Sequence, residues 1–235
     1  MCRLLLMNKE GEKDIEQIYG LDKYLKYLEK QLGGHGNGFA LLKNNKVIKL
    51  EKGVKLNVKD IANVLRKTDY DWALFHTRLA SIGTICDKNC HPFKRKNIVL
   101  AMNGTEKTVE FFSNAMKITD TEAILEIINK YNLELSALSN LNSIFMGFFK
   151  GNPFVVADNL FNIKIYKNRN ALAFASSFPY KFRNIFTPTE HFCWNGGELD
   201  VKMEKYKRTY IPSYYKNLVY DDDIYGQYYF DILNK

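Results

Sequence analysis

The sequence has little of what marks a secreted or membrane protein. It holds four cysteines and five prolines in 235 residues. Its opening apolar run, Leu4 to Met7, is far too short for a signal peptide or a membrane span. Without a secretory leader, four cysteines do not indicate a disulfide framework. We therefore expect a cytoplasmic protein that has no membrane partner.

The chain also lacks internal repeats and segments that resemble linkers. Its hydrophobic content of 46% is enough to bury a substantial core. We expect one folded domain over residues 2–205, followed by a Tyr-rich extension over residues 206–235. The extension contains the acidic run Asp221–Asp223. Packing on the domain is the expectation for this extension, and docking of a partner is the alternative.

The sequence lacks the motifs of two ligand classes that its composition suggests, nucleic acids and phosphate groups. The formal net charge is +8, but lysines alternate with apolar residues in stretches such as Tyr24–Lys30, a pattern typical of solvated helix faces. No nucleic-acid-binding motif is present, so we do not expect a nucleic-acid partner. The glycine-rich segment 33–38 lacks the lysine of a phosphate loop and leads into an apolar strand pattern, which predicts a turn entering a hairpin.

The possible metal ligands do not have the paired short spacing of structural zinc sites. Cys86, Cys90 and His91 form one group in the sequence, and His191 and Cys193 form a second. We expect no metal and no cofactor. We expect these three cysteines to be buried, inert thiols, and His91 to be a structural histidine in a loop with its hydrogen bonds satisfied.

What the sequence does contain is a cysteine at its second position. Removal of Met1 would leave Cys2 with a free α-amine beside its thiol. An α-amine titrates near ~8 and a thiol near ~8.5, so the amine can act as the base for its own thiol. A cysteine at this position is also compatible with a small buried side chain. The assignment of Cys2 as a nucleophile therefore depends on segments downstream.

Two apolar runs end in groups that such a nucleophile needs. Residues 72–75 lead into His76-Thr77-Arg78, which places a guanidinium at the end of a predicted strand. Residues 98–102 lead into Asn103-Gly104, which combines a side-chain amide with a backbone N–H that can approach a ligand closely. An amide and a backbone N–H together can stabilise an oxyanion.

A third segment, Thr119–Glu122, precedes an apolar helical pattern. Its acceptor side chains stand at the positions that cap a helix N-terminus. The sequence therefore predicts that Asp120 is a capping residue, a ligand-binding carboxylate, or both.

Together with Cys2, these segments resemble the class II glutamine amidotransferases, which are of the N-terminal-nucleophile type. The motifs that carry the resemblance are His76-Thr77-Arg78, Asn89-Cys90-His91-Pro92-Phe93, Asn103-Gly104 and Asp120-Thr121-Glu122. The opening Met1-Cys2-Arg3 is most like the stand-alone subgroup of that family. The resemblance implies an α+β fold, a four-layer αββα sandwich in which two antiparallel sheets lie between helical layers and the N-terminal strand is central.

The resemblance also implies a role for each candidate residue. Cys2 would attack the side-chain amide of glutamine, and the Asn103 side chain and the Gly104 N–H would receive the oxyanion. Arg78 would bind the α-carboxylate, because a planar guanidinium forms paired hydrogen bonds with a carboxylate. Asp120 would bind the α-ammonium group.

We therefore expect a glutamine amidotransferase or glutaminase that supplies ammonia to a separate synthetase. Nothing after the family-like portion is large enough to activate an acceptor. One alternative is a γ-glutamyl amide hydrolase that acts on a small metabolite. The other is a noncatalytic regulatory or binding protein on the same scaffold, which would keep Arg78 and Asp120 without removal of Met1.

The coarse pattern of apolar residues predicts the order of helices and strands. It predicts a strand over residues 2–7, a helix ending near Leu32, a hairpin at Asn44-Asn45 and a helix after Asn57. Strands should end near His76 and Met102. Two helices then follow, and the chain returns to strands from about residue 143, with turns at 151–153 and 168–170.

Overall fold

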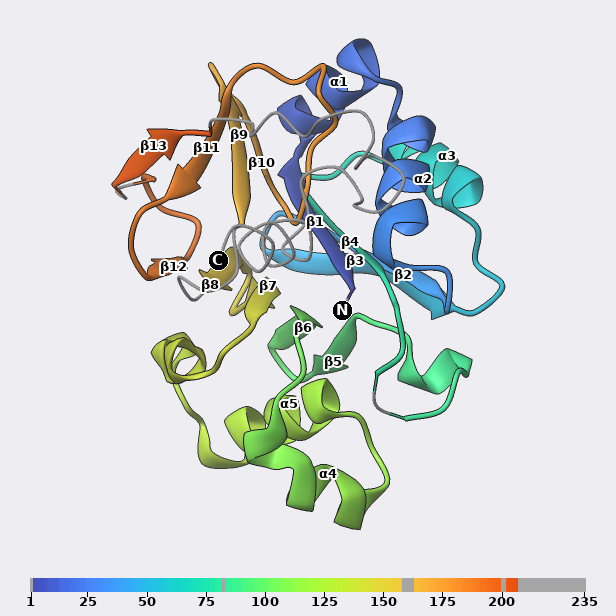
Figure 1. The fold of residues 1–235 in the computed structure, drawn as a ribbon, viewed down its shortest axis with the longest axis vertical. Helices are drawn as coiled ribbons and strands as arrows, with labels where there is room; N and C mark the ends of the chain where they lie inside the picture. Colours follow the sequence, from blue (N-terminus) through green and yellow to red (C-terminus); the bar gives the residue numbers. More distant parts are fainter. Residues whose placement is uncertain (1, 82, 158–162, 200–201, 207–235) are drawn as a thin grey trace, which may run out of the picture.

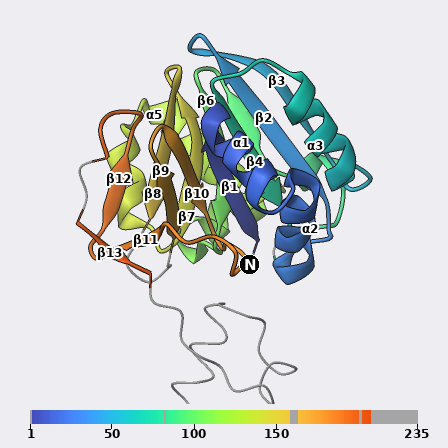
Figure 2. The same cartoon turned by 90° about the horizontal axis from the view of Figure 1, so that it is seen from above.

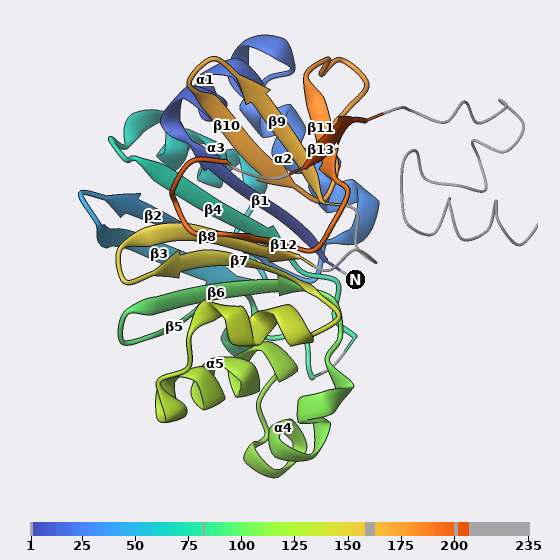
Figure 3. The ribbon, with the colours of Figure 1, turned by 90° about the vertical axis from the view of Figure 1, so that its left-hand side faces the viewer.

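Two antiparallel sheets lie face to face between two layers of helices, as Figure 3 shows. The structure is a computed structural model that describes residues 2–81, 83–157, 163–199 and 202–206. Figure 1 gives the labels of the helices and strands in these segments. The predicted four-layer αββα sandwich is confirmed.

The larger sheet places the N-terminal strand in its interior. Its strand order is β13-β11-β9-β10-β1-β4-β2-β3. In that order the strands span Met203–Lys205, Ile185–Pro188, Lys164–Asn168, Ala171–Ala175, Arg3–Asn8, Trp72–Thr77, Asn37–Lys43 and Lys46–Gly53. Strand β1 pairs with β10 on one side and with β4 on the other, where Arg3 lies opposite Thr77.

The smaller sheet has the strand order β12-β8-β7-β6-β5. In that order its strands span Phe192–Trp194, Asn152–Ala157, Ile144–Phe149, Ile98–Asn103 and Phe93–Arg95. Strand β6 lies between β5 and β7, and its last residue, Asn103, lies opposite Ile144. The end of β6 is therefore held by a neighbouring strand.

The helices cover the outer faces of the two sheets. On the larger sheet these are α1 (Lys9–Ile18), α2 (Leu21–Leu32) and α3 (Val58–Lys67), which Figure 2 shows across its strands. On the smaller sheet α5 (Asp120–Tyr131) lies against the strands, and α4 (Glu110–Met116) packs on α5. Three short 3-10 helices complete the described part: η1 (Asp87–Asn89), η2 (Lys107–Val109) and η3 (Leu135–Asn140).

Side chains that precede the helices define where several of them begin. The side chain of Asn57 accepts a hydrogen bond from the Asp60 N–H at the start of α3. At the start of α5 the Thr119 hydroxyl accepts from the Glu122 N–H at 3.2 Å. Such N-caps typically contribute ~1 kcal/mol to helix stability. The Thr119 cap makes Asp120 the first residue of α5.

Strand β1 is buried on both faces. Leu4 and Leu6 belong to the core between the two sheets, whereas Leu5 and Met7 belong to the core between the larger sheet and its helices. Successive side chains of a strand point to opposite faces, so a strand between two cores reads as a continuous apolar run. Full burial of such a side chain stabilises the fold by roughly 1.5–3 kcal/mol. The residue just before this strand, Cys2, is therefore firmly placed.

The elements differ from the sequence expectation in two details. The helical stretch before residue 33 is two helices, because the chain bends at Gly20, whose φ of 88° favours glycine. The turn predicted at residues 151–153 lies at Lys150 and Gly151 instead, and β8 begins at Asn152. The predicted turn at residues 168–170 lies where expected, between β9 and β10.

The predicted C-terminal extension falls mostly outside the described residues, which end at Tyr206. The Tyr206 ring packs against the core beneath the helices of the larger sheet, and its N–H donates to the Ile185 carbonyl at 2.9 Å. The boundary at residue 205 and the packing of residues 207–235 remain predictions. Within the described segments, none of the helices combines the length and apolar character that crossing a membrane requires.

Candidate functional site

The candidate residues come from four elements whose ends meet at one edge of the sandwich. Cys2 precedes β1 and Arg78 follows β4, and these neighbouring antiparallel strands place the two residues at the same edge of the larger sheet. Asn103 ends β6 of the smaller sheet, and Asp120 begins α5. The two sheets and one helix therefore each contribute to the site.

Cys2 is held by contacts from both sheets. Its backbone N–H donates to Asn103 Oδ1 at 2.9 Å. The Leu79 N–H donates to Cys2 Sγ at 3.4 Å, and Sγ lies 3.6 Å from the Leu79 carbonyl oxygen. Because Asn103 Oδ1 is used as an acceptor, its Nδ2 is the group left to donate, and it lies 3.4 Å from Ser176 Oγ.

Burial raises the pKa of the Cys2 thiol. The Leu79 N–H and the positive charge of Arg78 act in the opposite direction, but burial has the larger effect. The thiol therefore stays protonated at neutral pH and needs a base to become a thiolate nucleophile.

A cavity of about 20 Å³ brings most of the candidate residues together. Its walls are formed by Cys2, Arg78, Leu79, Ser81, His91, Met102, Gly104, Thr119, Asp120 and Thr121. Four of the five predicted site residues line it, and Asn103 joins them through its bond to the Cys2 backbone. The space suits roughly one water molecule.

Arg78 and Asp120 are both buried and both held by backbone groups. Arg78 Nη1 donates to the Thr84 carbonyl at 2.9 Å. Asp120 Oδ1 accepts from the Thr121 N–H at 2.9 Å, and Oδ2 accepts from the Glu106 N–H at 3.0 Å. Burial nevertheless raises the pKa of the Asp120 carboxyl, against these hydrogen bonds and the Arg78 charge.

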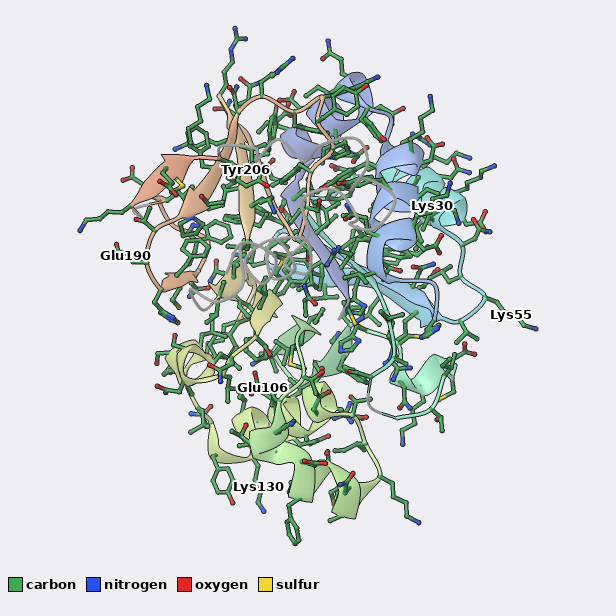
Figure 4. All side chains as sticks on the ribbon, in the orientation of Figure 1. Lys30, Lys55, Glu106, Lys130, Glu190 and Tyr206 are labelled. Atoms are coloured by element: carbon green, nitrogen blue, oxygen red, sulfur yellow. The ribbon has the colours of Figure 1, made fainter. Side chains whose placement is uncertain are left out.

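Gly104 is a position where a side chain does not fit. A Cβ atom there would lie 2.0 Å from Ser143 Oγ. Ser143 in turn donates to the carboxylate of Glu106, whose N–H binds Asp120. Figure 4 labels Glu106, which lies among side chains packed between the strands and the helices α4 and α5. The absence of a side chain at Gly104 lets its backbone approach the cavity closely.

The sequence interpretation missed a pair of buried histidines beside the cavity. The rings of His76 and His91 pack against each other with centroids 4.1 Å apart and their planes tilted by 36°. His76 Nε2 lies 3.2 Å from the Met102 carbonyl oxygen, and His91 Nε2 lies 2.8 Å from Thr121 Oγ1. Both histidines fall within motifs that carry the family resemblance. Those motifs were the signal in the sequence that could have placed them near the site.

The expectation that His91 has satisfied hydrogen bonds was wrong in one respect. Its Nδ1 is buried and has no hydrogen-bond partner among the described residues. The reason is its packing, because His76 covers its ring and Phe93 packs against it edge-on at 4.9 Å. Only Nε2 is left facing a polar group.

Because the two histidines are buried, we expect the free energy of unfolding to decrease in acid. Burial lowers the pKa of His76 from 6.5 to about 3 and moves the pKa of His91 in the same direction. Between about pH 6.5 and pH 3, His76 is therefore protonated in the unfolded chain and neutral in the folded protein. The free energy of unfolding should fall by up to ~1.4 kcal/mol per pH unit for this histidine as the pH drops below about 6.5.

Urea unfolding of the wild type and His76→Leu, measured from about pH 7 to pH 5, would check this prediction. The Leu variant should show a shallower dependence of unfolding free energy on pH. His191→Gln, which changes an exposed histidine, is the control and should keep the wild-type slope. Equal slopes for wild type and His76→Leu would contradict the prediction.

The expectation that Cys86, Cys90 and Cys193 are all buried was wrong for two of them. Cys90 is buried as predicted, whereas Cys86 is partly exposed and Cys193 is exposed. Cys193 lies on β12 at the edge of the smaller sheet, and its side chain faces away from both cores. Among the residues that the structure describes, no group of three or more His, Cys, Asp or Glu side chains is placed to hold a metal ion.

Comparison with known proteins agrees with this arrangement. Residues 1–150 match the family described as glutamine amidotransferases class-II. That match covers more than half of the 235-residue chain. The chain therefore belongs to the class II glutamine amidotransferase family, as its motifs predicted. None of the curated proteins compared with the chain matches it.

Two solved structures that resemble this fold are of longer chains. A glutamine phosphoribosylpyrophosphate amidotransferase from B. subtilis is similar over 86% of this chain, with 17% identity and a TM-score of 0.58. A structure described as the allosteric regulatory enzyme of purine biosynthesis is similar over 86%, with 17% identity and a TM-score of 0.56. The chain spans about half the length of each. At this identity the likeness concerns the fold alone.

Proposed function

We propose that this chain hydrolyses the side-chain amide of glutamine with Cys2 as its nucleophile, after removal of Met1. One observation carries the proposal: Cys2, Arg78, Gly104 and Asp120 line a single cavity. The side chain of Asn103 hydrogen-bonds the backbone nitrogen of that same cysteine. A thiol, two charged anchors and two oxyanion donors thus meet at one place.

Two buried charged residues supply the binding of glutamine. Arg78 binds the α-carboxylate through its guanidinium, and Asp120 binds the α-ammonium group. Because both are buried, their interactions with the substrate are stronger than they would be in water. The γ-amide then reaches Cys2, which lines the same cavity.

The chemistry follows from the groups around Cys2. Removal of Met1 turns the Cys2 nitrogen, whose N–H donates to Asn103 Oδ1, into an α-amine. This amine takes the thiol proton, and the thiolate attacks the amide carbon. Asn103 Nδ2 and the Gly104 N–H stabilise the oxyanion. The C–N bond breaks as the ammonium returns its proton to the leaving ammonia. Water then attacks the thioester, releasing glutamate and restoring the thiol.

The ammonia has two possible fates, which define the particular role of the chain. In the leading proposal a separate synthetase is the partner that uses it. In the alternative, the same site cleaves a γ-glutamyl amide of a small metabolite and needs no partner. A noncatalytic binding protein would retain Met1 and bind glutamine without cleaving it.

The test is glutamate release from glutamine by purified chain whose intact mass shows that Met1 is absent. Wild type should release glutamate and ammonia in equal amounts. Arg78→Lys should raise KM about tenfold or more and change kcat less, because lysine keeps the charge but loses the planar pair of donors. Lys55→Arg, an exposed change remote from the cavity, is the matched control.

The outcomes separate the candidates. Wild-type chain without Met1 that releases no glutamate from glutamine or from γ-glutamyl amides would overturn the proposal. Faster cleavage of a γ-glutamyl amide than of glutamine, with no synthetase recovered from native lysate, would favour the metabolite hydrolase. An unchanged KM for Arg78→Lys would remove Arg78 from the binding of the carboxylate.

A further inference from the structure

The packed pair of histidines, His76 and His91, connects the two sheets beside the cavity. His76 lies on β4 of the larger sheet, and His91 lies two residues before β5 of the smaller sheet. Both are buried, at 0% and 5% exposure, and no carboxylate among the described residues hydrogen-bonds to either ring. The two rings bond instead to a backbone carbonyl and a hydroxyl.

His76 is connected to the end of β6. Its Nε2 lies 3.2 Å from the Met102 carbonyl oxygen, and because a carbonyl oxygen can only accept, Nε2 must carry the hydrogen. Met102 immediately precedes Asn103, and both pair with β7. The His76 ring therefore holds the peptide from which the Asn103 side chain projects toward Cys2.

His91 is connected to the start of α5. Its Nε2 lies 2.8 Å from Thr121 Oγ1, and the Thr121 N–H donates to Asp120 Oδ1 at 2.9 Å. This chain of contacts runs from the ring through Thr121 to the carboxylate. His91 lines the cavity, but its Nε2 is used by Thr121, and no hydrogen bond joins either ring to Cys2.

We infer that His76 and His91 are positioning residues for the two halves of the reaction site. His76 acts through Met102 on Asn103 and so on the stabilisation of the oxyanion. His91 acts through Thr121 on Asp120 and so on the binding of the α-ammonium group. The inference rests on the proposed function. Close packing of the two rings couples the end of β6 to the start of α5, because densely packed side chains cannot shift independently.

Single substitutions should separate the two roles in the kinetics of glutamine hydrolysis. His76→Leu should lower kcat about tenfold with KM changed less than about threefold. His91→Leu should raise KM about tenfold with kcat changed less than about threefold. His76→Gln and His91→Gln keep a polar group near the position of Nε2 and should recover most of the loss.

Thermal unfolding identifies the variants that remain folded, and only these are compared. Folded Leu variants with wild-type kinetics would overturn the inference. Equal changes of kcat and KM in both variants would also overturn it, since a general loss of structure predicts that result. If neither Gln variant recovered any activity, the hydrogen bonds made by the Nε2 atoms would not be what positions Asn103 and Asp120.

A measurement without catalysis keeps the inference testable if the proposed function fails. Hydrogen exchange followed by mass spectrometry reports on residues 98–104 and 119–125 separately. His76→Leu should increase exchange in residues 98–104, and His91→Leu in residues 119–125. Increases in the same segment for both variants would overturn the positioning roles. Absence of glutamate release by wild type, together with this separation, would contradict only the proposed function.

Discussion

Cys2→Ala should abolish glutamate release, with a loss of at least about 10⁴-fold in single-turnover rate. Cys2 is the only cysteine that lines the cavity, and it is the residue that gains an α-amine when Met1 is removed. Its thiol is buried and has a raised pKa, so the reaction depends on that adjacent base. Alanine leaves the amine and the cavity in place but removes the nucleophile.

Single-turnover glutamate release by wild type and variant, with intact masses verified, measures this effect. Cys86→Ala and Cys193→Ala are the controls, because both thiols lie outside the cavity walls. Each should keep activity within about threefold of wild type. Comparable rates for wild type and a folded Cys2→Ala would rule out the cysteine mechanism and leave the binding-protein interpretation.

Asn103→Ala should lower kcat by about 10²–10³-fold, which corresponds to ~3–4 kcal/mol of transition-state stabilisation. The Asn103 amide has two tasks in the proposed mechanism. Its Oδ1 orients the Cys2 nitrogen at 2.9 Å, and its Nδ2 is available to the oxyanion. Both tasks concern the chemical step, so KM for glutamine should change much less than kcat.

Steady-state kinetics of Asn103→Ala should be compared with those of Ser176→Ala. Ser176 Oγ lies 3.4 Å from Asn103 Nδ2 and accepts the Leu4 N–H at 3.0 Å. Removing this hydroxyl perturbs the surroundings of Asn103 while leaving its amide intact, and we expect a loss below about tenfold. A rise in KM alone for Asn103→Ala, with kcat unchanged, would show that Asn103 binds substrate instead of stabilising the oxyanion.

The strands and helices that carry the site could be predicted from local sequence. The apolar runs before His76 and Asn103 became β4 and β6, because a strand buried on both faces needs an unbroken apolar segment. Thr119 became the cap of α5, because a hydroxyl before a helical pattern accepts from the free N–H groups of the first turn. These signals depend on neighbours within a few residues.

Other features of the site could not be predicted in this way. Nothing near His91 in the chain indicates that His76 covers its ring, since the two residues come from different sheets. Nothing near Gly104 indicates that Ser143 occupies the space of a side chain there. Such contacts depend on how two sheets pack against each other, and they decide which polar atoms keep a partner.

By itself the sequence determined the family, the apolar runs that form the site strands and the chemical groups at the ends of those strands. Local periodicity and motif spacing are enough for these, because each is encoded within a short segment. Only the tertiary structure decided that Asn103 Oδ1 faces the Cys2 nitrogen and that Cys2, Arg78 and Asp120 line one cavity of about 20 Å³. The reason is that residues from β1, β4, β6 and α5 form this site, and the space between them is set by the packing of the whole sandwich.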